Sequence, residues 1–166
     1  MDVDNTDFLA FVAAADAQKL DYILIGGLAL ILNGAVRFTQ DADIWLQPTN
    51  ENRDKFVKAL VAFGYDESDV ETIRSTDFTQ PQIVRIHDIP MDVLTRVHHH
   101  FNYAACRKRA KSVTLSGDYT VYFLHINDLR ETKVLARRTK DLNDILMIDE
   151  LIAARKEPDE FETDNS

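Results

Sequence analysis

Two glycines interrupt an apolar run near the start of the chain, and they sharply limit how this region can fold. Residues 22–25, YILI, have the β-branched and aromatic composition of a buried strand. Gly26 and Gly27 break the run, and LALILNG then resumes with helical composition as far as Gly34. The pattern predicts a strand, a glycine turn and a helix. Such a turn can cradle phosphate, although a tight turn without a ligand explains a glycine pair equally simply.

Two aspartates follow the predicted helix. Asp41 and Asp43 lie on either side of Ala42, at the start of the apolar segment 42–46, which we expect to form a second buried strand. Side chains two residues apart on a strand point to the same side. At about 4 Å, two carboxylates repel by about 1 kcal/mol in water and by about 4 kcal/mol at an effective dielectric near 20. A solvated pair therefore needs no ligand, whereas a partly buried pair favours a bound cation.

A third carboxylate, Asp92, stands alone among apolar neighbours in IPMDVLT. Oxygen ligands of this kind suit Mg²⁺ or Mn²⁺, and three carboxylates would permit two ions about 3.5–4 Å apart. Asp92 is therefore the candidate third ligand beside the aspartate pair.

The rest of the chain predicts a single α/β domain over residues 1–154, followed by an acidic tail, 155–166, that we expect to be disordered. No repeat or linker indicates a further boundary. The predicted elements are a helix at 7–17 capped by Asn5 or Thr6, a helix from Thr49 or Asn50 to Gly64, short β segments at 70–74, 82–87 and 91–95, a strand at 119–126, and two helices between 127 and 154 that meet near Thr139.

Composition narrows the possible environments and partners. The 166 residues carry a formal net charge of -9, which argues against a whole surface built to bind nucleic acid. The apolar runs are shorter than the ~20 residues of a membrane span, and the acidic start lacks the basic region of a signal peptide. We therefore expect a cytoplasmic protein with no membrane partner. The single cysteine, Cys106, excludes an internal disulfide.

The order of these segments resembles the nucleotidyltransferase superfamily, whose core pattern is an apolar residue, Gly and Gly or Ser, a gap, and then Asp, an apolar residue, an acid and an apolar residue. Residues 23–46, 91–97 and 129–148 look like the small nucleotidyltransferase-like proteins related to the AbiEii toxins of abortive-infection toxin–antitoxin systems. The resemblance spans about residues 8–152. It implies a nucleotidyltransferase-like mixed β-sheet flanked by helices, of α/β (α+β) class.

The resemblance also implies a role for each matching residue. Gly26 and Gly27 would form the triphosphate-binding turn. Asp41, Asp43 and Asp92 would bind the metal, with Asp92 also placed to take a proton from the attacking hydroxyl. The expected nucleotide-binding side chains are basic, namely Arg37, Lys133, Arg137 and Lys140. Asp141 and Asp144 would orient these cations through ion pairs, and Arg37 could contact either phosphate or an acid.

A protein of this kind would be a Mg²⁺- or Mn²⁺-dependent enzyme that transfers a nucleoside monophosphate from an NTP, such as ATP, to an acceptor. The acceptor could be a protein, a tRNA end or a small molecule, and a cognate toxin or antitoxin partner or a homodimer is also conceivable. Because the chain is short, a non-catalytic nucleotide-binding or protein-interaction module is an alternative. An aminoglycoside- or lincosamide-type antibiotic nucleotidyltransferase is another.

Two features depart from the pattern. Gly27 replaces the Ser of many active relatives, so a hydroxyl that could bind phosphate is missing. His98, His99 and His100 follow the Asp92 segment, and neighbours on a regular helix or strand diverge by about 100° or 180°. We therefore expect the three histidines to lie in a surface loop or at a helix start without sharing a metal, although one of them could line the acceptor pocket.

Overall fold

A mixed β-sheet organises the chain, which we describe from a computed structural model covering residues 1–156. Within these residues the sheet has six strands in the order β3-β4-β2-β1-β6-β5. β1 pairs antiparallel with β2 and parallel with β6, and β2 pairs parallel with β4. The strands are β1 (Tyr22–Ile25), β2 (Ala42–Leu46), β3 (Ile83–Ile86), β4 (Met91–Leu94), β5 (Lys111–Leu115) and β6 (Tyr119–Phe123).

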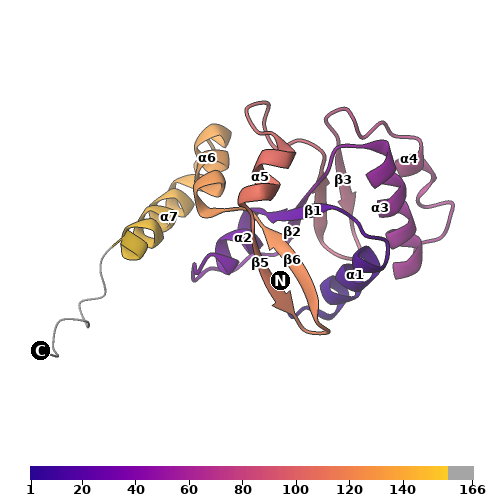
Figure 1. Ribbon diagram of the computed structural model, residues 1–166, viewed down its shortest axis with the longest axis horizontal. Coiled ribbons are helices and arrows are strands. Elements are labelled where there is room, and N and C mark those ends of the chain that lie inside the picture. The colour runs from indigo at the N-terminus through magenta and orange to yellow at the C-terminus, as the bar shows by residue number, and fades with distance from the viewer. Residues whose placement is uncertain (157–166) are drawn as a thin grey trace, which may run out of the picture.

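Helices lie around this sheet and gather at its two ends. Figure 1 shows α1, α3 and α4 at one end of the molecule and α6 and α7 at the other. The mixed sheet with flanking helices confirms the expected α/β class. The helices of residues 1–156 are α1 (Thr6–Ala17), α2 (Gly26–Leu32), α3 (Asn50–Phe63), α4 (Glu71–Arg74), α5 (Tyr103–Arg109), α6 (Ile126–Ala136) and α7 (Asp141–Lys156).

Local sequence explains where several elements begin. The Asn5 side chain accepts hydrogen bonds from two backbone N–H groups at the start of α1, and Thr49 accepts one at the start of α3. α3 ends at Gly64, whose φ of 133° is disfavoured for residues with a side chain. Burial then holds the elements together: Phe11 of α1 and Phe56 of α3, both fully buried, meet edge to face with ring centroids 6.4 Å apart.

The structure contradicts some of the secondary-structure elements predicted from the sequence. The predicted β segment at 70–74 is largely the short helix α4, where an ion pair between Arg74 and Glu71, three residues apart, suits a helical turn. The strand predicted to reach residue 126 ends at Phe123, because the His125 side chain accepts the Asn127 N–H and caps α6. α5 and β5 were not predicted at all.

The elements that carry the site differ little from expectation. α2 begins directly at Gly26, so no separate turn lies between β1 and the helix. α7 continues to Lys156, so the first two residues of the predicted tail are helical. Residues 157–166 of that tail lie outside the described part of the chain. No helix within the described residues is long and apolar enough to span a membrane.

Candidate active site

Strand pairing brings the three predicted carboxylates together. The parallel register of β2 and β4 places Asp43 opposite Asp92, and Asp41 directly precedes β2. We call Asp41, Asp43 and Asp92 the acid cluster. Because β1 runs antiparallel to β2, its last residue, Ile25, pairs with Asp43, and the chain enters α2 beside the carboxylates. All three acids line one cavity of about 470 Å³.

The electrostatics of the acid cluster are those of a site that requires positive charge. Burial, followed by the neighbouring carboxylates of Asp92 and Asp41, raises the pKa of Asp43 from 3.8 to about 6. The charges of Lys133 and Arg138 act in the opposite direction without cancelling the effect. A carboxylate with a raised pKa gains from a cation held close to it, so the cluster fits a divalent metal.

One basic residue next to the acid cluster was not predicted. Arg85 of β3 stands opposite Asp92 in the antiparallel pairing of β3 and β4. Its Nη2 lies 3.1 Å from Asp41 Oδ1, and its Nη1 lies 3.1 Å from Asp92 Oδ1. The sequence held a signal for this contact, because a hairpin between the two predicted β segments places Arg85 across from Asp92. A guanidinium therefore partly neutralises the two outer carboxylates.

Both glycines are required by the side chains packed against them. Gly26 has a φ of 63°, and a Cβ at this position would lie 2.2 Å from Asp43 Oδ2. A Cβ at Gly27 would lie 2.6 Å from Thr39 Oγ1, whose hydroxyl donates to the Asp41 carbonyl oxygen over 3.1 Å. Contacts this short do not occur for real Cβ atoms, so the glycine pair gives the site side chains room beside the backbone.

The same cavity is also lined by basic groups that two acids hold in place. Lys133 of α6 is buried, and its Nζ lies 3.4 Å from Asp141 Oδ1 and 2.9 Å from Asp144 Oδ2. Arg138 Nε lies 2.7 Å from Asp141 Oδ2, and Arg37 Nη1 lies 2.5 Å from Asp144 Oδ1. We call these five residues the cation network. It links the loop before β2 with α6 and α7.

The acids of the cation network act as partners of its bases. Burial alone would raise the pKa of Asp141, but its hydrogen bond with Arg138 and the charge of Lys133 hold the pKa below its usual value. Asp141 therefore stays ionised and orients the two cations. These ion pairs match the role expected for Asp141 and Asp144, except that they bridge separate elements and do not run along one helix.

Three of the four basic residues predicted to bind the nucleotide line the cavity, and the fourth, at the end of α6, does not. Lys133, Lys140 and Arg37 line the cavity. Arg137 ends α6 in the left-handed conformation, with φ 53° and ψ 30°, and among residues 1–156 it is not one of those lining the cavity. Its neighbour Arg138 lines the cavity instead. Because the chain turns at the end of α6, an argument from helical spacing does not predict that Arg138 lines the cavity in place of Arg137.

Two other cavities clarify which pocket is the site. One of about 230 Å³ adjoins the first, shares Asp43, Lys133 and Arg138 with it, and has apolar walls that include Leu94 and Val97. Another, of about 460 Å³, lies around Arg107. There the guanidinium already has partners, since it pairs with Asp21 and lies 3.2 Å from the centre of the Tyr122 ring. The cavity with the acid cluster differs from both, because its lining brings the three carboxylates together with Arg37, Lys133, Arg138 and Lys140.

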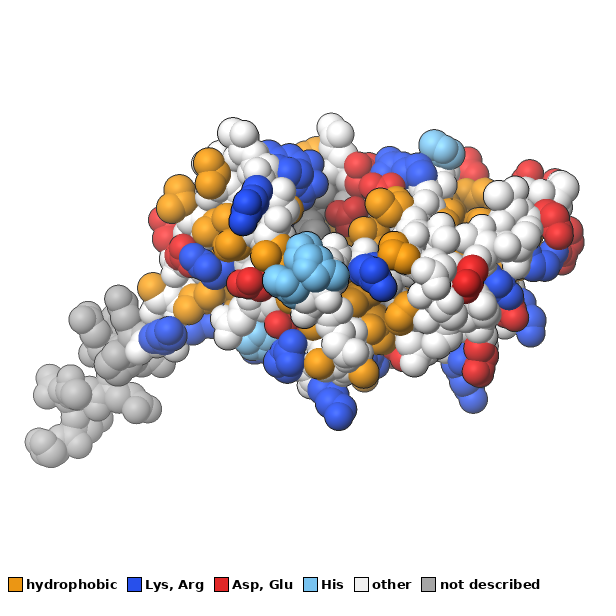
Figure 2. Space-filling view, turned by 90° about the horizontal axis from the view of Figure 1, so that it is seen from above, with side chains coloured by type: hydrophobic (Ala, Val, Ile, Leu, Met, Phe, Trp, Pro, Cys, Tyr) orange, Lys and Arg blue, Asp and Glu red, His pale blue; other side chains and the backbone are white. Residues whose placement is uncertain are grey.

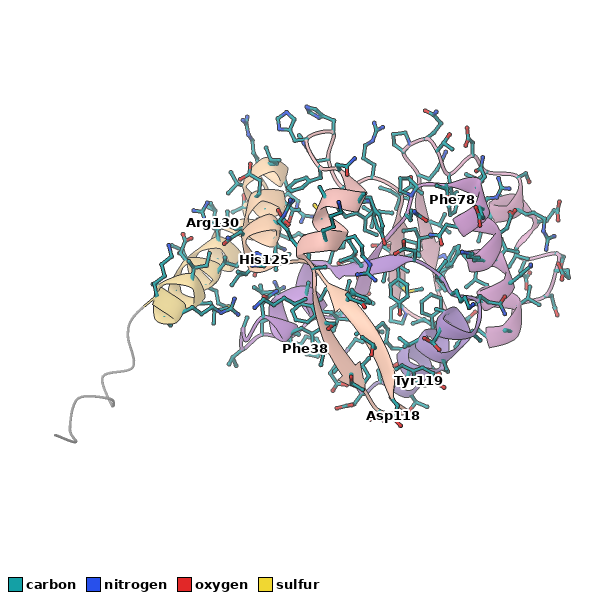
Figure 3. All side chains as sticks on the ribbon, in the orientation of Figure 1. Phe38, Phe78, Asp118, Tyr119, His125 and Arg130 are labelled. Carbon is teal, nitrogen blue, oxygen red and sulfur yellow. The ribbon has the colours of Figure 1, made fainter. Side chains whose placement is uncertain are left out.

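The figures show how open this region is. In Figure 2 acidic side chains lie inside a hollow with basic side chains on both sides of it. Phe38, labelled in Figure 3, lines the same cavity and is 75% exposed. A charged ligand that carries a planar group could therefore reach both the cations and an aromatic side chain from solvent.

Comparison with known proteins agrees with this geometry. No curated protein is detectably similar to the chain. A family model described as a nucleotidyltransferase of unknown function (DUF6036) matches residues 7–154, which include the whole acid cluster and cation network. The resemblance to the nucleotidyltransferase superfamily is thereby confirmed, and the chain belongs to this family of nucleotidyltransferases of unknown function.

Proposed function

We propose that the protein transfers a nucleoside monophosphate from an NTP to a hydroxyl-bearing acceptor, with Mg²⁺ or Mn²⁺ at the acid cluster. One observation carries the proposal: three carboxylates line a cavity of about 470 Å³ together with Arg37, Lys133, Arg138 and Lys140. Metal-binding oxygens and phosphate-binding cations in one cavity are what an NTP–metal complex needs.

The acid cluster fits the metal by its chemistry. Asp41, Asp43 and Asp92 would hold Mg²⁺ or Mn²⁺, which when bound would neutralise charge on the reacting phosphate. Arg85 now contacts oxygens of Asp41 and Asp92. Its side chain is 36% exposed, so it can turn toward solvent and release both carboxylates.

The basic residues would bind the rest of the triphosphate. Lys133 and Arg138 are held in place by Asp141, and a fixed cation needs little reorganisation when charge develops on the leaving group. Arg37 and Lys140 line the same cavity and would contact the outer phosphates. The cation network would therefore stabilise pyrophosphate as it departs.

The reaction then needs one proton acceptor. The acceptor oxygen bonds to the α-phosphorus, and the bond from this phosphorus to the β-phosphate bridging oxygen breaks, with its electron pair leaving on pyrophosphate. Asp92, which faces the cavity, would take the hydroxyl proton. The adjoining 230 Å³ cavity shares Asp43 with the nucleotide cavity and is where we place the acceptor.

The test uses NTPs labelled at the α-phosphate, Mg²⁺ and cell lysate as the source of acceptors. We expect the wild-type protein to label an acceptor, and Asp41→Asn and Asp43→Asn to abolish the labelling. Asp149→Asn is the matched control, because Asp149 lies on α7 and pairs with Arg130 outside the cavity. Labelling that survives both site substitutions would refute the proposal.

The same preparation separates the alternatives. Metal-dependent NTP binding without label transfer or pyrophosphate release would indicate a non-catalytic nucleotide-binding module. Labelling of an aminoglycoside or lincosamide would indicate an antibiotic-modifying enzyme. A cognate toxin or antitoxin partner, a homodimer and a cytoplasmic location stay predictions, and co-purification from the native host tests the first two.

A further inference from the structure

Three histidines outside the acid cluster converge in the loop between β4 and α5. Their ring centroids are 4.1 Å apart for His98 and His99, 4.2 Å for His99 and His100, and 4.8 Å for His98 and His100. Each residue offers a ring nitrogen within 4.8 Å of the others. Figure 2 shows the resulting patch of histidine side chains on the surface. We call these three residues the histidine turn.

The three histidine side chains lie close together because this segment is a turn, whereas on a regular helix or strand they would point apart. The Phe101 N–H bonds to the His98 carbonyl oxygen over 3.0 Å, which closes a tight turn around His99 and His100. The His100 backbone N–H also donates to Nδ1 of His98 over 3.2 Å. The chain reversal therefore brings together three side chains that would point apart on a helix or strand. Our expectation that they could not share a metal assumed regular structure.

The chemistry of the donor set selects the ligand. Imidazole nitrogens bind Zn²⁺ and other borderline transition metals, whereas Mg²⁺ prefers oxygen. Tetrahedral Zn²⁺ with bonds of about 2.0–2.1 Å places its ligands about 3.3 Å apart. The ring nitrogens need to approach by an ångström or more, and exposed side chains such as those of His99 and His100 can do so by rotating.

Protonation and hydrogen bonding also permit metal binding. A metal binds the neutral imidazole, and His98 has an unprotonated ring nitrogen, because its Nδ1 accepts a hydrogen bond. In the hydrogen bond with His100, Nδ1 of His98 is the acceptor, and the proton is on Nε2. Coordination through either nitrogen therefore breaks this exposed 3.2 Å bond, and water can then satisfy the freed N–H.

We propose that His98, His99 and His100 form a binding site for Zn²⁺ or a similar transition-metal dication, separate from the acid cluster. Three histidines leave a fourth position of the tetrahedron for water or another ligand. The two sites differ in donor type, nitrogen at the histidine turn and oxygen at the acid cluster, so the protein can hold two kinds of metal at once.

Calorimetric titration with Zn²⁺ tests the site. The protein carries Asp43→Asn and the buffer contains excess Mg²⁺, so that binding at the acid cluster does not contribute. We expect one Zn²⁺ per chain. His98→Ala and His100→Ala should each weaken binding by about tenfold or more, because even outer partners of a metal ligand contribute 10- to 100-fold. His87→Ala is the matched control, since His87 is exposed and belongs to another loop.

A second measurement guards against loss of folding. The thermal unfolding of each variant without metal should match that of the parent protein, because the turn is at the surface. Proton NMR of the histidine rings should show shifts of His98, His99 and His100 at one equivalent of Zn²⁺ while His87 stays in place. The site is refuted if Zn²⁺ does not saturate one binding site, or if the double variant of His98 and His100 binds as tightly as the parent protein.

Discussion

Replacing Asp43 with asparagine should stabilise the metal-free protein at neutral pH. In the folded protein, burial and the charges of Asp92 and Asp41 raise the pKa of Asp43 from 3.8 to about 6. A carboxyl with a raised pKa favours the folded state fully below pH 3.8, and this contribution is lost as the pH rises through 6. Ionised Asp43 therefore destabilises the fold at pH 7 to 8, and the uncharged amide removes that effect.

The size of the effect follows from the pKa shift. A shift of roughly two pH units corresponds to about 3 kcal/mol at 1.36 kcal/mol per unit. Asp43 is only half-buried, and solvent screens part of this repulsion, so we expect about 1–2 kcal/mol. For a domain of this size that free energy raises the midpoint of thermal unfolding by about 3–6 °C.

The assay is thermal unfolding followed by circular dichroism, in EDTA, from pH 4 to pH 8. The advantage of Asp43→Asn over the wild type should grow from pH 4 to about pH 7 and then level off. Added Mg²⁺ should reverse the order, because a ligand at 100 times its Kd stabilises only the protein that binds it, by about 2.7 kcal/mol. Asp149→Asn, which loses an ion pair with Arg130, should show no such gain.

Two results would refute this reasoning. An asparagine variant no more stable than the wild type in EDTA at pH 8 would show that the acid cluster does not repel itself as the geometry indicates. A variant that gains stability in EDTA and still responds fully to Mg²⁺ would show that Asp43 is not a metal ligand. The first result concerns the electrostatics, and the second concerns the proposed metal site.

Three further substitutions, with Arg137→Gln as a control, test the surroundings of the acid cluster. Arg85→Gln should tighten Mg²⁺ binding by about threefold to tenfold in calorimetry, because a competing charge near two carboxylates is removed; unchanged affinity would show that Arg85 does not compete. Lys133→Met should lower the free energy of unfolding by about 3–5 kcal/mol in urea, since it leaves two buried acids short of a partner; a change below about 1 kcal/mol would contradict this. Arg138→Gln should weaken ATP binding about tenfold, a typical loss for one charge-assisted contact, and Arg137→Gln should not; equal losses would count against the cavity as described.

Local sequence signals, joined by the resemblance to nucleotidyltransferases, predicted the centre of the site. Each signal occupies a few adjacent residues: the apolar run of β1, the break at Gly26 and the acids flanking Ala42. The class of the fold followed from the same segments. Asp92 was predicted because a lone acid in an apolar strand is costly to bury without a cation.

Elements with weak local signals were missed. β5 at the edge of the sheet is mostly exposed, so its side chains show no buried face that a hydrophobic pattern could reveal. α4 has four residues, and its Thr and Ile, preceded by Val70, favour a strand by composition. The pairing of β5 with the following strand, β6, holds it in the sheet without a recognisable pattern of buried side chains.

Tertiary structure decided which charges meet. Pairing of β3 with β4 placed Arg85 on two carboxylates, and the left-handed end of α6 exchanged Arg137 for Arg138 at the cavity. The turn between β4 and α5 brings the rings of His98, His99 and His100 together. The sequence alone determined a glycine break after one apolar strand and an acid pair at the start of another in an α/β fold, because each of these signals lies within a few adjacent residues. Their charge partners come from other strands and helices, and only the packing of those elements brings them within ion-pair distance.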